Sequence, residues 1–187
     1  SNVQSLEMTR ANAKAMGLIA AHDTGIDAEI TFSSGFSFDF DSSDGISAGS
    51  MDFVGVALHE IGHALGFVSG VDVLDYYSYF DGSVYSDVDY SPFATPLDFT
   101  RCSDESEAKG ADMDWTAGAA PKHFAINGQC ANGARVDNAW STGSFQGDGR
   151  QASHWKDNAS LGILDPTASY GEFLQISSLD IFAFDVI

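Results

Sequence analysis

Two histidines and a glutamate within one apolar stretch are the residues best suited to chemistry. His59, Glu60 and His63 form the pattern H-E-x-x-H inside residues 53–67, whose other members are all apolar or glycine. A run of this composition predicts a largely buried helix. On a helix, residues four apart lie on the same face, so both imidazoles can reach one point.

This arrangement predicts a metal site. Imidazole nitrogens are preferred ligands of zinc, although manganese, iron and cobalt also accept them. Glu60 lies about 100° around the helix from His59, beside the metal, where it can hold a water molecule. Burying these groups among apolar side chains is costly unless a divalent cation compensates them. The pattern also arises by chance in core helices, but Gly66 and Phe67 follow it directly and the chain has only five histidines.

A third protein ligand must come from elsewhere in the chain. In the extended pattern H-E-x-x-H-x-x-G-x-x-H the third histidine follows the glycine by three residues, and this chain has Ser69 at that position. The metal must therefore be reached from a distant segment. We expect His154 to be the third ligand, with His123 as the alternative, and we expect His22 at the surface.

The order of motifs resembles a known class of enzymes. HEIGHALGF is followed, after a long insertion, by ASHWKD and by a G-I-L-D-P turn at residues 162–166. This order resembles the metzincin zinc peptidases of the leishmanolysin-like kind and, more closely, a family of secreted bacterial metallopeptidases. The resemblance spans most of residues 28–187. It implies one catalytic Zn²⁺ with Glu60 as the general base and three histidine ligands: His59, His63 and His154.

Residues after the third histidine have expected roles, of which only that of Leu164 follows from the resemblance. Leu164 stands where a turn methionine is expected, and its similar volume allows it to fill the same space. Asp157 and Asp165 are candidates to accept the second ring N–H of the ligands, as acceptors near metal sites usually do. Tyr170 is a candidate to stabilise an oxyanion.

We expect an α+β fold in a single catalytic domain. The resemblance implies a twisted N-terminal sheet, an active-site helix, an irregular inserted subdomain and a C-terminal helix. The N-terminal part spans residues 1–69, the loop-rich insertion 70–150, and the segment with the third ligand, the turn and the last helix 151–187. The edge of the N-terminal sheet is expected to hold an extended substrate.

Hydrophobic periodicity predicts the elements of the two ends. Residues 3–21 are predicted as a helix, and residues 28–32 and 36–40 as strands because apolar and polar residues alternate there. Apolar residues at helical spacing predict a helix over residues 176–187, with Ser177 and Ser178 as cap candidates.

The insertion from Gly70 to Arg150 lacks helical periodicity and is expected to contain short strands and loops. Residues 124–126 and the dipeptide Asn127-Gly128 are typical of a strand that leads into a hairpin turn. This subdomain is expected to line the cleft.

Two cysteines lie in this insertion, Cys102 and Cys130. In an exported protein their pairing is the natural expectation, and it would stabilise the fold by about 3 kcal/mol. The alternative is a pair of unbonded buried thiols.

Three carboxylates precede Gly45, those of Asp39, Asp41 and Asp44. They are a candidate Ca²⁺ site, but their spacing departs from that of an EF-hand loop. A solvated acidic turn is the favoured interpretation.

The charge of the chain argues against several kinds of partner. The net charge is −19, with 27 acidic and 8 basic residues, whereas nucleic acids and anionic membranes are bound by basic surfaces. No run of about 18 apolar residues offers a membrane span. We expect a monomeric, secreted enzyme in its mature form without a signal peptide, acting on a peptide or protein substrate.

Two other functions fit the same residues. One is a zinc-stabilised binding or adhesion module without turnover, and the other is a zinc amidase that acts on cell-wall material.

Overall fold

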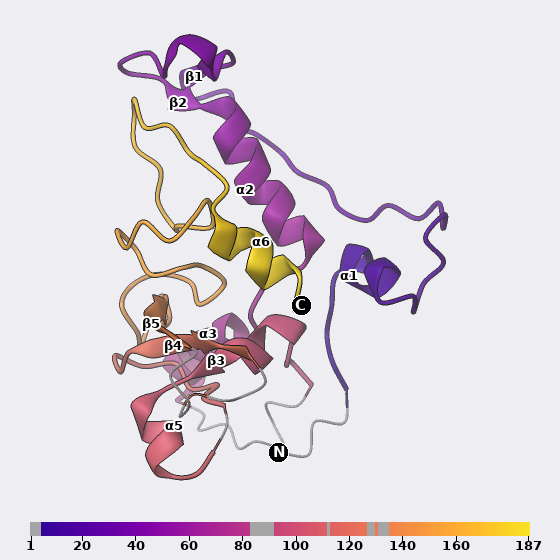
Figure 1. The fold of residues 1–187 in the computed structure, drawn as a ribbon, viewed down its shortest axis with the longest axis vertical. Helices are drawn as coiled ribbons and strands as arrows, with labels where there is room; N and C mark the ends of the chain where they lie inside the picture. The colour runs from indigo at the N-terminus through magenta and orange to yellow at the C-terminus, as the bar shows by residue number, and fades with distance from the viewer. Residues whose placement is uncertain (1–4, 83–91, 112, 127–129, 131–134) are drawn as a thin grey trace.

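Helices and short strands are mixed in this chain, and the fold is α+β (Figure 1). The computed structural model describes residues 5–82, 92–111, 113–126, 130 and 135–187. Its helices are α1 Arg10–Ala15, α2 Phe53–Leu65, α3 Val71–Asp81, α5 Asp104–Ala108 and α6 Ser178–Phe184, with 3₁₀ turns at Ser42–Asp44 and Pro96–Thr100. Its strands are β1 Phe38–Asp39, β2 Met51–Asp52, β3 Arg101–Cys102, β4 Lys122–Ala125 and β5 Arg135–Trp140.

Helix α2 has well-defined ends. At its start the Asp52 carboxylate accepts the backbone N–H of Gly55 at 3.0 Å, which satisfies one of the free donors of the first turn. At its end Gly66 adopts φ +127°, and a β-carbon there would lie 2.4 Å from the Asn12 side chain. Glycine is therefore required both for the turn and for the close approach of α1. The predicted helix over residues 53–67 is confirmed with slightly narrower bounds.

Helix α6 confirms the predicted C-terminal helix within residues 176–187 and lies beside α2 (Figure 1). Its N-cap is Ser177, whose hydroxyl accepts the N–H of Asp180, while the Asp180 carboxylate accepts the N–H of Ser177. The two helices meet at Gly62, where an added β-carbon would lie 3.6 Å from the ring of Phe184.

Strands β3, β4 and β5 form an antiparallel sheet below the end of α2 (Figure 1). The side chains over this sheet make the main apolar core, in which Trp140 and Trp155 stack with ring centroids 4.4 Å apart. The predicted disulfide between Cys102 and Cys130 is confirmed, with a Cα–Cα distance of 6.0 Å. It ties β3 to the chain after β4.

The N-terminal elements are shorter than predicted. The helix expected over residues 3–21 is limited to α1, because Gly17 adopts φ +73° shortly after its end. No strand forms over residues 28–32, and residues 36–40 contribute only β1, which pairs in parallel with β2.

The twisted N-terminal sheet is therefore reduced to a two-residue pair. The alternating phenylalanines pack instead around Phe53 at the start of α2, with ring centroids 4.7–5.4 Å from it. Phe32, Phe38 and Phe40 thus make aromatic contacts with a helix, although Phe40 stays 68% exposed.

Helix α3 lies in the region where only strands and loops were expected. Its residues are rich in tyrosine, valine and aspartate, which have modest helix propensity, so the sequence signal is weak. Tertiary contacts stabilise it, since Val71 and Leu74 are buried with Ala94 and Ala152. The hairpin turn predicted at Asn127-Gly128 lies outside the described residues. Among the described helices, none has the length and hydropathy needed to cross a membrane.

Candidate metal centre

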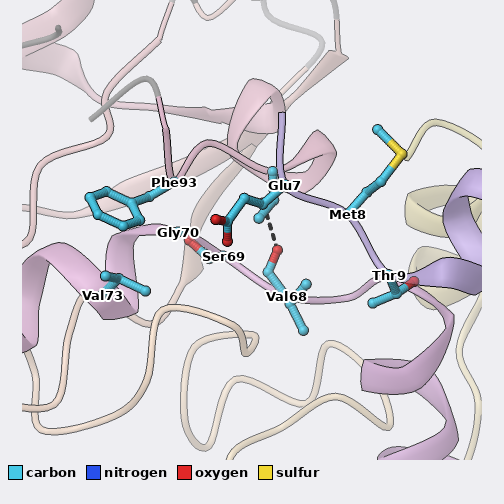
Figure 2. A pocket seen from close by; sticks show the side chains of 9 residues that line it. Glu7, Met8, Thr9, Val68, Ser69, Gly70, Val73 and Phe93 are labelled. Carbon is cyan, nitrogen blue, oxygen red and sulfur yellow. Dashed lines mark hydrogen bonds between the residues drawn. The ribbon is translucent and has the colours of Figure 1, made fainter. Parts of the chain in front are cut away.

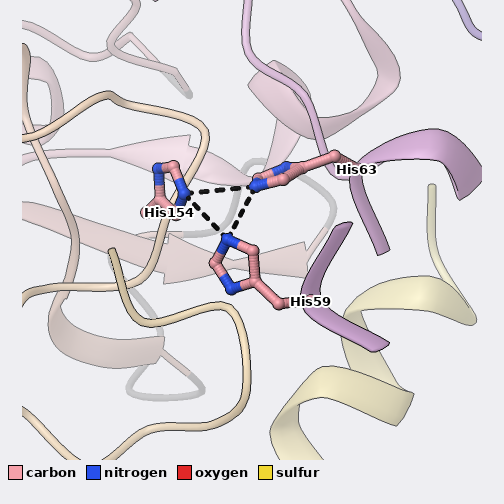
Figure 3. Close-up of side chains that lie close together, drawn as sticks. All are labelled: His59, His63 and His154. Carbon is pink, nitrogen blue, oxygen red and sulfur yellow. Dashed lines mark hydrogen bonds between the residues drawn. The ribbon is translucent and has the colours of Figure 1, made fainter. Parts of the chain in front are cut away.

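Three imidazoles converge on one point (Figure 3). The Nε2 atom of His63 lies 3.1 Å from Nε2 of His59 and 3.1 Å from Nε2 of His154, and the remaining Nε2–Nε2 distance is 3.3 Å. His59 and His63 come from α2, and His154 comes from a segment without regular secondary structure. Within the described part of the chain, this is the only group of histidines, cysteines and acidic residues close enough to hold a metal ion.

Backbone carbonyls orient the two helical histidines. The Nδ1 atom of His59 lies 2.8 Å from the carbonyl oxygen of Ile163, and Nδ1 of His63 lies 2.7 Å from that of Phe67. A carbonyl can only accept a hydrogen bond, so each Nδ1 carries a proton and each neutral ring presents a lone pair at Nε2. Lone pairs 3.1 Å apart repel each other, and a cation between them removes this repulsion.

The spacing of the three nitrogens suits a metal ion. Zinc–nitrogen bonds of about 2.0–2.1 Å in tetrahedral geometry place ligand nitrogens roughly 3.3–3.4 Å apart. The Nε2–Nε2 distances of 3.1–3.3 Å lie close to this value. Together with the carbonyl-bound Nδ1 atoms, the three histidines fit a metal with imidazole preference.

Burial keeps two of the three histidines in the form that binds metals. Desolvation lowers the pKa of His63, and it lowers the pKa of His154 to about 3, with the neighbouring His63 and His59 adding to the effect. His154 is only 7% exposed. The rings of His63 and His154 are therefore neutral at neutral pH, as metal ligation requires.

Glu60 adjoins the cluster on α2. Its side chain is half-buried, and it forms no hydrogen bond or ion pair with any residue that the structure describes. By helix geometry it lies about 100° around the axis from His59. A carboxylate without such partners is free to interact with water or a ligand beside the three histidines.

Ser69 contacts the segment that carries the third histidine, although it is not a ligand itself. The backbone N–H of Ser69 donates to the hydroxyl of Ser153 at 2.8 Å, and Ser153 directly precedes His154. The chain thus returns, 84 residues later, to the place just after α2 where the extended pattern carries its third histidine.

The turn after His154 packs against the helix that carries the other two histidines. Leu164 is fully buried, and its Cδ1 atom would lie 3.1 Å from a β-carbon built at Gly62. Gly62 stands between His59 and His63 in α2. Leu164 therefore packs against this helix between the two histidines, and the neighbouring Ile163 carbonyl orients His59.

Asp180 joins the turn to the His154 segment. Its Oδ1 atom accepts the indole N–H of Trp155 at 2.7 Å, and its Oδ2 atom accepts the N–H of Ile163 at 2.9 Å. Asp180 is only 1% exposed. The only signal of Asp180 in the sequence is the capping pattern S-x-x-D, which does not indicate a role near the histidines.

The expected roles of Asp157 and Asp165 are not found. Asp157 accepts hydrogen bonds from Arg150 and Thr167, and Asp165 accepts from Asn158 and Thr167. Both hold the loop after His154 rather than an imidazole. Backbone carbonyls orient His59 and His63 instead, and a carbonyl has no signature in a sequence.

His123 is not part of the cluster. It lies in β4, where its Nδ1 accepts the N–H of Asn138 at 2.9 Å and its Nε2 lies 3.3 Å from Asp104. The alternative third ligand is therefore excluded by position. His22 is exposed, as expected.

The candidate calcium site is not formed. Asp39 accepts the N–H groups of Asp41 and Ser47, and Asp41 accepts that of Ser43. These carboxylates stabilise a turn and do not gather with Asp44 into a ligand group among the described residues. The favoured interpretation, a solvated acidic turn, agrees with this geometry.

Tyr170 follows the turn and is 58% exposed. It does not belong to the histidine cluster, and its role in stabilising an oxyanion stays a prediction.

A pocket of about 250 Å³ is separate from the histidine cluster (Figure 2). Its wall includes Val68, whose carbonyl accepts a hydrogen bond from the hydroxyl of Thr95 at 2.7 Å. None of the three histidines lines it. The lining residues are Glu7, Met8, Thr9, Val68, Ser69, Gly70, Val73, Phe93 and Thr95.

Comparison of the chain with protein-family models, with curated proteins and with solved structures finds no match. The function is therefore argued from the residues of the site.

Proposed function

We propose that this chain is a secreted, zinc-dependent endopeptidase of metzincin type. The observation that carries the proposal is the convergence of three Nε2 atoms next to Glu60, a carboxylate that forms no hydrogen bond or ion pair with any described residue. A zinc ion held by three imidazoles keeps a fourth position for water, lowers the pKa of that water towards about 7 and polarises a carbonyl.

The residues of the chain have distinct tasks in this proposal. His59, His63 and His154 hold the metal, and the carbonyls of Ile163 and Phe67 fix the rings of the first two with Nε2 unprotonated. Glu60 accepts the proton of the attacking water and delivers it to the leaving amine.

Two features support the metzincin type. Gly66 ends α2 three residues after the second histidine, His63, and the third histidine comes from beyond that turn. Leu164 packs under α2 at the level of the histidines, which is the task of the turn methionine, and a leucine has a similar volume.

The charge of the chain and its disulfide support the proposed substrate class and the proposed secretion. A net charge of −19 favours neutral or cationic peptide substrates. A disulfide persists in oxidising compartments, which supports a secreted protein.

The test combines metal analysis with a cleavage assay. We expect about one zinc per chain, and cleavage of unfolded casein that 1,10-phenanthroline abolishes while its non-chelating isomer 1,7-phenanthroline does not. A purified chain that binds no zinc would overturn the proposal. Zinc without casein cleavage, but with hydrolysis of cell-wall peptides, would favour the amidase, and zinc without any turnover would favour the binding module.

A further inference from the structure

His154 differs from the other two histidines in how it is held. His59 and His63 lie on α2, whose backbone hydrogen bonds fix their positions, whereas residues 152–156 form no regular helix or strand. The position of His154 therefore depends on contacts from outside its own segment. We propose that Asp72, in the first turn of α3, is a positioning residue for His154 and thereby sets the metal affinity. This inference rests on the proposed metal centre.

The contacts of Asp72 converge on the two residues before His154. Its Oδ1 atom accepts the backbone N–H of Ala152 at 2.6 Å. Its Oδ2 atom accepts the backbone N–H of Ser153 at 3.1 Å and also the Ser153 hydroxyl. Both carboxylate oxygens are thus occupied by donors from the segment that leads into the ligand, and charge-assisted bonds of this kind are strong.

The Ser153 hydroxyl extends this connection to α2. It donates to Asp72 and accepts the N–H of Ser69 at 2.8 Å, and Ser69 lies three residues after the glycine that ends α2. One hydroxyl therefore joins the His154 segment to α3 and to the chain that leaves the helix of the other two histidines. Asp72 orients that hydroxyl. It therefore acts on the position of His154 relative to the α2 pair, together with the hydrogen bonds that Ser141 and Arg101 donate to the carbonyls of His154 and Ala152.

A purely structural role for Asp72 makes a different prediction. An acidic residue in the first turn stabilises a helix through the helix dipole, and its loss would lower stability without a specific change in metal binding. Asp75 provides a matched control on the same helix. It is 1% exposed, and its two oxygens accept the backbone N–H groups of Phe145 and Gln146 at 2.8 and 2.9 Å, away from the histidines.

The substitution Asp72→Asn keeps the size of the side chain but replaces one acceptor by an NH₂ group that faces N–H donors. We would measure zinc dissociation constants of the full chain by competition with a chromophoric chelator for wild type, Asp72→Asn, Asp75→Asn and Ser153→Ala. Urea unfolding of the zinc-free proteins and the absorption spectrum of the Co²⁺-loaded proteins complete the set.

We expect Asp72→Asn to weaken zinc binding by about 10- to 100-fold, the range found when groups that orient ligands are removed. Its Co²⁺ spectrum should change, and Ser153→Ala should act in the same direction. Asp75→Asn should lower stability but keep the zinc affinity and the Co²⁺ spectrum of wild type.

Zinc binding by Asp72→Asn at wild-type strength would overturn the inference. If that variant does not fold, Ser153→Ala decides, and an unchanged dissociation constant there would overturn it as well. A wild-type chain that binds no zinc would refute both the inference and the proposed function. Wild-type zinc binding that Asp72→Asn weakens, without any peptidase activity, would refute only the endopeptidase and support the role of Asp72.

Discussion

At the scale of single residues, Glu60 is the side chain on which turnover should depend. We expect Glu60→Gln to lower kcat/KM for peptide hydrolysis by about 10²- to 10⁴-fold, because glutamine has nearly the same size but cannot accept the proton of water. Zinc content should stay at the wild-type level, since Glu60 is not one of the three converging residues. Hydrolysis at the wild-type rate would show that another group is the base.

His154 and His123 form a second residue-scale test. We expect His154→Ala to lose most of its zinc by elemental analysis, because one of three converging nitrogens is removed. His123→Ala is the matched control. The His123 imidazole accepts a hydrogen bond from the backbone of Asn138 and is not part of the cluster, so the variant should keep its zinc. Full zinc loading of His154→Ala would assign the third ligand to another residue.

At the scale of elements, the residue that ends α2, Gly66, is constrained both by its backbone conformation and by close packing against α1. Gly66 and Gly82 both have positive φ, +127° and +70°, but only Gly66 has a neighbour within 4 Å of an added β-carbon, the Asn12 side chain of α1. Gly82 lies in the left-handed helical region, whereas Gly66, with ψ 4°, lies outside it, so a side chain at Gly66 meets greater backbone strain as well as the contact with α1.

We expect Gly82→Ala to lower the free energy of unfolding by about 1 kcal/mol through backbone strain. Gly66→Ala should cost about 1–3 kcal/mol more, because its backbone conformation is less accessible to alanine and because the β-carbon also overpacks the α1 contact. Urea unfolding of the two variants measures the difference. Equal losses would mean that α1 moves away without cost.

At the scale of the whole molecule, the disulfide restrains the largest insertion. It closes a loop with a sequence separation of 28 residues, for which chain entropy predicts a stabilisation of about 3–4 kcal/mol. We expect the double variant Cys102→Ala, Cys130→Ala to lose about this amount in urea unfolding. An unchanged unfolding midpoint would show that the reduced chain already holds β3 and β4 together.

The buried histidines make the stability of the metal-free protein depend on pH. The pKa of His154 is about 3 in the folded chain, and that of His63 is also lowered, whereas an unfolded histidine has its ordinary value of 6.5. Between these values the unfolded chain binds more protons, so stability falls as the pH decreases from 6.5 towards 3.

We expect the free energy of unfolding, measured in the presence of a chelator, to decrease steadily over this range. His154→Ala should have a flatter profile, because it lacks the group with the larger shift. A wild-type profile without slope between pH 6.5 and 4 would contradict the burial of these rings.

A second acidic transition should follow from Asp114. Its burial opposes ionisation, but hydrogen bonds from Lys122, Ser103 and Thr116 outweigh this and lower its pKa to about 2. Its contribution to stability is therefore present above about pH 4 and lost as the pH falls towards 2.

Local features of the site were determined by the sequence itself. The four-residue spacing of His59 and His63 becomes a common direction through helix geometry, and Gly66 marks the end of that helix, since both depend on neighbours in the chain. The helix cap at Ser177 likewise depends only on residues nearby in the chain. In contrast, the predicted strand over residues 28–32 was wrong: the segment pairs with no described strand, and its Phe32 packs against Phe53 of α2 instead.

Only the tertiary structure decided which distant groups complete the site. His123 and His154 are equal as residue types, and packing of the 152–156 segment against Ser69 and α3 brings one of them to the α2 pair. The carbonyl of Ile163 reaches His59 across 104 residues of sequence. Such contacts are set by how helices and loops pack in three dimensions, and neither residue type nor spacing along the chain encodes them.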